Sequence, residues 1–94
     1  MKQYEDQCFK NLMQIVYQIE QENIRQVKKW GVQKKTMFEW VTNTTEELGS
    51  LAKAISEYEY RKGSKAKVIS EAVQVATLAL KIAEMYEREK EEDK

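Results

Sequence analysis

Only two short breaks interrupt the helical pattern of this 94-residue chain, which contains no proline. The breaks are "WGVQKKT" at residues 30–36 and "YRKGS" at residues 60–64, and each contains a glycine. Glycine readily adopts the backbone angles that end helices, so we expect both breaks to be turns between helices. No stretch alternates apolar and polar residues as a half-buried strand does. The sequence therefore predicts an all-α fold in a single domain, residues 1–94.

Apolar residues recur at helical spacing in three segments, Gln3–Lys29, Thr36–Arg61 and Ser64–Lys90, which we predict to be helices. Thr36 and Glu39 have the spacing of a capping box at the start of the second helix. Gly49 lies inside that helix, where a glycine often permits close approach of another helix. The predicted buried stripes of the first and second segments are Leu12, Ile15, Val16 and Ile19, and Leu48, Leu51, Ala52 and Ile55. The third segment has two stripes. One consists of Ile69, Ala72, Ala76, Ala79 and Ala83, and the other of Val68, Val75, Leu78 and Ile82.

The third helix carries more apolar surface than two neighbouring helices can cover. A chain this short buries a limited fraction of its surface, so association is a natural source of stability. We therefore expect a small bundle of three main helices that is completed by oligomerisation into a homodimer or homotetramer. Val75, Leu78 and Ile82 are the residues expected between subunits.

Composition excludes several classes of function. Sixteen Lys and Arg residues balance sixteen Asp and Glu residues, so we expect no nucleic acid polymer as a partner. The chain has no histidine, which removes histidine-based catalysis and histidine-containing zinc sites. The one cysteine, Cys8, forms no internal disulfide, and we expect it to be a small, partly buried apolar residue. No apolar run is long enough to span a bilayer, so we expect a cytoplasmic protein with no membrane partner.

Helix geometry groups the polar residues of the second and third helices into two pairs. Glu47 and Ser50 share one helix face, and Glu71 and Gln74 share another, because residues three apart lie on one side of a helix. The turn at Gly63 makes the two helices antiparallel. Glu47 lies twice as far from that turn as Glu71 does, so the two pairs are not forced to the same level.

The segments "KKWGVQKKTMFEWVTNTTEELGSLAKAI" and "ISEAVQVATLALKIAEM" resemble the MazG-like all-α nucleoside triphosphate pyrophosphohydrolases over roughly residues 25–86. That family shows a W-G-x-Q segment, then E-E-x-x-E on one helix and E-x-x-D on the next. The resemblance implies a MazG-like helical domain that uses Mg²⁺ to split a nucleoside triphosphate into a monophosphate and pyrophosphate.

The same resemblance assigns roles to individual residues. Ser50 and Gln74 stand where the family has carboxylates. Neutral oxygens are poorer ligands for Mg²⁺, so we expect the metal to bind more weakly than in the full site. Glu46 or the amide of Asn43 is expected to contribute a further ligand. The expected catalytic residues are Glu46, Glu47 and Glu71, and the expected metal positions are Glu47, Glu71, Ser50 and Gln74. The chemistry of the side chains, not the resemblance, suggests base stacking by Trp30 and phosphate pairing by Lys53, Arg61 and Lys62. The expected substrate-binding residues are therefore Trp30, Gln33, Lys53, Arg61 and Lys62.

A non-catalytic interpretation remains open for each of these residues. Glu46 and Glu47 fit a solvated helix face, and Gln74 fits a polar position in a helix-packing layer. Core packing explains Trp30 and Trp40, and solubility explains Lys53, Arg61 and Lys62. The alternative function is therefore a non-catalytic MazG-like helical module for nucleotide binding or assembly. The missing carboxylates favour that module, whereas the retained glutamates and the "WGVQ" segment favour the enzyme.

Overall fold

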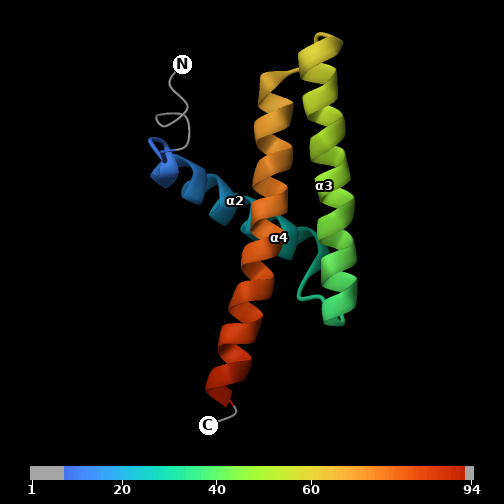
Figure 1. Cartoon of the computed structure of the whole chain (residues 1–94). Coiled ribbons are helices and arrows are strands. Elements are labelled where there is room, and N and C mark those ends of the chain that lie inside the picture. Colours follow the sequence, from blue (N-terminus) through green and yellow to red (C-terminus); the bar gives the residue numbers. More distant parts are fainter. Residues whose placement is uncertain (1–7, 93–94) are drawn as a thin grey trace.

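Three helices make up most of the structure, a computed structural model that describes residues 8–92 (Figure 1). They are α2 (Leu12–Trp30), α3 (Met37–Tyr60) and α4 (Lys65–Glu92). Residues 8–92 contain no strand, so the predicted all-α class is confirmed. The predicted bounds of the second and third helices differ from these by one or two residues. The predicted start at Gln3 lies outside the described residues, and residues 8–11 are not helical.

The long helix α4 is the centre of the fold, because it packs against both α3 and α2. α3 and α4 form an antiparallel hairpin, and α2 crosses α4 at a steep angle (Figure 1). The C-terminal part of α4 extends past the beginning of α3 (Figure 1). The radius of gyration is 15.5 Å, compared with about 12 Å for a compact domain of this length. Over the described residues, none of the helices has the length and apolar character needed to cross a bilayer.

Local signals account for the start and end of each turn. Gly31 ends α2 with φ of 70°, as the sequence predicts. The predicted capping box is confirmed, since the Thr36 hydroxyl accepts from the Glu39 N–H at 3.2 Å and the Glu39 carboxylate accepts from the Thr36 N–H at 2.9 Å. Between α3 and α4, a Cβ at Gly63 would lie 2.8 Å from the Glu57 carbonyl carbon, so only glycine fits there. These contacts fix the order and direction of the helices.

The core is small. Among the side chains of residues 8–89, the buried ones are Trp40, Ala54, Val73, Leu78, Glu71 and Thr77. The predicted stripes are therefore wrong in several places: Leu48, Ile55 and Ile69 are 42–54% exposed, and Ala52, Ala72, Ala79 and Ala83 are exposed as well. A Cβ at Gly49 would meet no atom within 4 Å, so no helix approaches closely at this position, contrary to the expectation. Cys8 is exposed rather than partly buried.

Helix α2 turns a largely polar face toward the rest of the molecule. Ile15 and Ile19 are partly buried as expected, but Glu22 and Gln26 continue the same inward stripe. The apolar residues Leu12, Val16, Ile24 and Val27 are 37–47% exposed. Gln26 accepts a hydrogen bond from the Lys81 ammonium of α4 at 2.6 Å. The inward face of α2 therefore brings charged and amide groups to the point where the three helices meet.

Candidate functional site

A cavity of about 250 Å³, which we call the small cavity, lies where α2, the 31–36 loop, α3 and α4 meet. The structure brings five of the sequence-predicted site residues to its wall, although they come from separate parts of the chain. These are Trp30, Gln33, Glu46, Glu47 and Gln74, and the polar residues Arg25, Gln26, Lys35 and Asn43 join them.

Glu71, on α4, does not line this cavity and is only 6% exposed. Its Oε1 atom accepts from the Lys67 ammonium at 2.9 Å. Its Oε2 atom is buried and has no hydrogen-bond partner. A buried carboxylate oxygen without a donor is costly, so this atom marks a place where a proton or a cation would be stabilising.

Glu47 of α3 lies against Glu71. Burial raises the pKa of the Glu47 carboxyl, and the neighbouring charge of Glu71 raises that pKa further. The charges of Glu22 and Glu46 act in the same direction. A proton on Glu47 or a bound cation would therefore reduce the repulsion between neighbouring carboxylates.

Arg25 of α2 also lines the small cavity, and its guanidinium contacts Glu22 of the same helix. The Arg25 guanidinium donates to both carboxylate oxygens of Glu22, at 2.9 and 2.7 Å, and the Gln26 amide donates to Glu22 at 2.7 Å. Hydrogen bonding from Arg25 is the main cause of a lowered pKa of Glu22. The same guanidinium lies 5.6 Å from the centre of the Trp30 ring.

Neither Glu22 nor Arg25 is among the residues that the sequence predicts for the site. Their i, i+3 spacing on a helix is a visible signal for an ion pair. Nothing in the sequence, however, indicated that this polar face of α2 would point inward, because the helix also carries an apolar stripe at regular spacing.

The residues around Glu47 and Glu71 fit a magnesium ion held through two carboxylates. Magnesium usually keeps several water ligands and is bound through one or two protein carboxylates together with substrate phosphates. The unpartnered Glu71 oxygen and its contact with Glu47 supply that pair, and Glu46, Asn43 and Gln74 offer further oxygens on the cavity wall. Within the described residues, no group of three or more Asp, Glu, Cys or His side chains is arranged to hold a metal ion.

The remaining predicted site residues lie elsewhere. Ser50 and Lys53 are exposed on α3 and do not line the small cavity. Arg61 and Lys62 belong to the turn between α3 and α4, at the end of α3 far from Trp40 (Figure 1). At 1.5 Å per residue, Arg61 is about 20 Å from Glu47 along the helix. The structure therefore leaves Arg61 and Lys62 away from the carboxylate pair, whereas Ser50 lies one helical turn from Glu47 with its side chain exposed.

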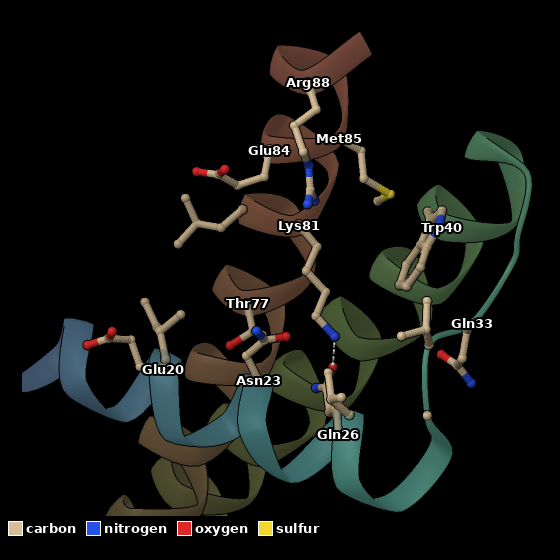
Figure 2. A pocket seen from close by; sticks show the side chains of 15 residues that line it. Glu20, Asn23, Gln26, Gln33, Trp40, Thr77, Lys81, Glu84, Met85 and Arg88 are labelled. Carbon is tan, nitrogen blue, oxygen red and sulfur yellow. Dashed lines mark hydrogen bonds between the residues drawn. The ribbon is translucent and has the colours of Figure 1, made fainter. Parts of the chain in front are cut away.

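A larger cavity of about 610 Å³ adjoins the small one, between α2 and the C-terminal half of α4 (Figure 2). Trp40 forms part of the wall of both cavities, and it is only 6% exposed, which agrees with a core-packing role. Lys81 reaches across the large cavity to Gln26, whereas Glu84 and Arg88 lie farther along α4 (Figure 2). Burial lowers the pKa of Lys81, and the nearby charge of Lys35 acts in the same direction.

A comparison of the chain with known protein families, with curated proteins and with solved structures finds no match.

Proposed function

We propose that this chain is a magnesium-dependent nucleotide pyrophosphohydrolase of the MazG-like type, which converts a nucleoside triphosphate into a monophosphate and pyrophosphate through a weakened metal site. The observation that carries the proposal is the contact between Glu47 and Glu71 beside the small cavity, with the buried Glu71 oxygen that lacks a donor. The location of Trp30 and Gln33 on the same cavity wall also supports it.

In this proposal, Glu47 and Glu71 hold the metal, which when bound neutralises phosphate charge and favours ionisation of a water molecule. Glu46 lines the cavity beside Glu47, so its carboxylate is placed to accept a proton from a water molecule there. The water oxygen forms a bond to the α-phosphorus, and the bond from that phosphorus to the pyrophosphate oxygen breaks. Trp30 is half-exposed and offers an indole face to the base.

A second candidate is a non-catalytic helical module for nucleotide binding or assembly. One specific observation favours it: the Lys67 ammonium already pairs with Glu71 at 2.9 Å, and this built-in cation partly compensates the carboxylate pair without any metal. The neutral amide of Gln74, which also lines the small cavity, likewise favours the non-catalytic module.

We also propose that the protein forms a homodimer or homotetramer through the groove between α3 and α4. This groove is lined almost entirely by apolar and threonine side chains, among them Val41, Leu48, Val75 and Ile82. Val41 and Leu48 are more than half exposed in the single chain. Leu78, which the sequence placed between subunits, is buried inside the chain itself and is not available to a second copy.

The test is pyrophosphate release from a panel of nucleoside triphosphates with Mg²⁺, using the parent, Glu47→Gln and the double variant Ser50→Glu with Gln74→Asp. The double variant restores two acidic positions, so we expect it to release pyrophosphate faster than the parent and to gain thermal stability when Mg²⁺ is added. Glu47→Gln should abolish release. Ser56→Glu, on an exposed part of α3, is the control for added charge.

Two results would change the proposal. A parent rate of about 1 s⁻¹ or more is ordinary for an enzyme, and it would show that the site is not weakened. If neither the parent nor the double variant binds Mg²⁺ or nucleotide, the non-catalytic module is the better description.

A further inference from the structure

Arg25 has the most constrained cationic group in the wall of the small cavity. Glu22 holds its guanidinium through two parallel hydrogen bonds, from Nε at 2.9 Å and from Nη2 at 2.7 Å. The Trp30 ring lies 5.6 Å from its central carbon. A two-point carboxylate contact and an aromatic neighbour together fix both the plane and the position of a guanidinium. Among the described residues, the Nη1 amino group has no hydrogen-bond partner, so donors remain for a ligand.

Arg25 and Glu47 line the same cavity. The hydrogen bonds with Glu22 are the main cause of a raised pKa of Arg25, and the charge of Glu47 adds to the effect, which shows that the two groups are electrostatic neighbours. A guanidinium held by Glu22 therefore lines the same cavity as Glu47, which is one carboxylate of the pair. A phosphate chain with a bound divalent cation has the complementary charges, since its oxygens suit the guanidinium and its cation suits the carboxylates.

We propose that Arg25 is a phosphate-binding residue of this site, that Glu22 is the residue that positions it, and that the ligand is the polyphosphate chain of a nucleotide. This inference rests on the proposed function, because it places the substrate's phosphates in the same cavity. It adds a residue from α2 that the sequence did not indicate, and it explains why the polar face of that helix points inward.

Lys29 provides a matched control. Its ammonium lies 4.9 Å from the centre of the same Trp30 ring, so it shares the aromatic contact with Arg25. Lys29 does not line the small cavity. Arg25→Gln and Lys29→Gln remove the same charge from neighbouring positions on α2, and only the first removes a group from the cavity wall.

The experiment measures the affinity of the full chain for inorganic tripolyphosphate by calorimetry, with Mg²⁺ and separately with a chelator. Parent, Arg25→Gln, Arg25→Lys and Lys29→Gln are compared, and circular dichroism confirms that each variant is helical. We expect Arg25→Gln to weaken binding about tenfold or more under both conditions, as is typical for loss of a charged hydrogen bond. Arg25→Lys should recover part of the loss, and Lys29→Gln should change affinity less than about twofold.

Glu22 is tested through its effect on Arg25. Glu22→Gln should weaken tripolyphosphate binding in the parent and have almost no further effect in the Arg25→Gln background, because both changes remove one interaction. An equal loss in both backgrounds would show that Glu22 acts on the fold instead of on Arg25.

The outcomes separate this inference from the proposed function. If the parent cleaves nucleotides but Arg25→Gln binds tripolyphosphate as well as Lys29→Gln does, the role of Arg25 is wrong and the proposed function stands. If the parent binds neither tripolyphosphate nor any nucleoside triphosphate with Mg²⁺, both are wrong.

Discussion

The carboxyl groups of Glu47 and Glu71 lie together between α3 and α4, and one oxygen of Glu71 is buried without a donor. A single ammonium, that of Lys67, pairs with Glu71. When both carboxyls are ionised, this arrangement is under repulsion that a proton or a cation relieves.

In the presence of a chelator, we expect stability to increase as the pH falls from about 7 to about 5. The pKa of Glu47 in the folded chain is raised above its ordinary value of 4.5, so on acidification the folded state binds this proton before the unfolded state does. Glu47→Gln should be more stable than the parent at neutral pH, and the difference should shrink toward pH 5. Urea unfolding at both pH values measures this, and a difference that grows on acidification would contradict it.

Leu78→Ala should destabilise the chain by about 2–4 kcal/mol, because it leaves a cavity among the few buried apolar side chains. Leu80→Ala is the matched control on the same helix. Leu80 is half-exposed, so its loss should cost less than about 1 kcal/mol. Equal losses in urea unfolding would show that Leu78 is not part of an intrachain core.

Two glycine substitutions should have opposite signs. Gly63→Ala should destabilise the chain by about 1 kcal/mol or more, because its Cβ would lie 2.8 Å from the backbone carbon of Glu57. Gly49→Ala meets no atom within 4 Å and lies inside α3, so it should stabilise the chain by about 0.5–1 kcal/mol. Thermal unfolding of the two variants side by side is the measurement, and a stabilising Gly63→Ala would overturn the structure of this turn.

Light scattering should show a dimer or tetramer at tens of micromolar, and Leu48→Glu should dissociate it, because a buried unpaired charge in an apolar interface is strongly unfavourable. Leu48 is 54% exposed and lines the apolar groove. Tyr60→Glu is the control, since Tyr60 is 84% exposed on the same helix and lies outside the groove. A monomeric parent would refute the proposed assembly.

The sequence predicted the helices well because their limits depend on local chemistry. The Thr36–Glu39 capping box and the φ of Gly31 are set by neighbouring residues, and both are as expected. The faces of the helices were predicted less well. Val73 is buried although it belongs to neither predicted stripe of the third helix, and Ile69 is exposed although it belongs to one. Apolar residues nearly surround that helix, so periodicity alone does not fix which side meets a neighbour.

The residues of the candidate site were predicted only in part, because their positions also depend on which helix faces meet. Spacing along one helix placed Glu47 and Gln74 on plausible faces, and both line the small cavity. Arg25 was not found, because its place in the cavity depends on the angle at which α2 crosses α4. Ser50 was named from a resemblance in sequence and Arg61 from its charge, and their positions in space depend on how far each lies along α3.

Trp40 lines both cavities, and this shared wall has a practical consequence. A molecule bound in either cavity would contact the same indole and change its surroundings. The ring is also enclosed, whereas that of Trp30 is half open to solvent, so the two indoles should fluoresce at different wavelengths. The shorter-wavelength part of the tryptophan emission should therefore report on Trp40 and the wall that the two cavities share. The longer-wavelength part should report on Trp30 and the surface beside Arg25.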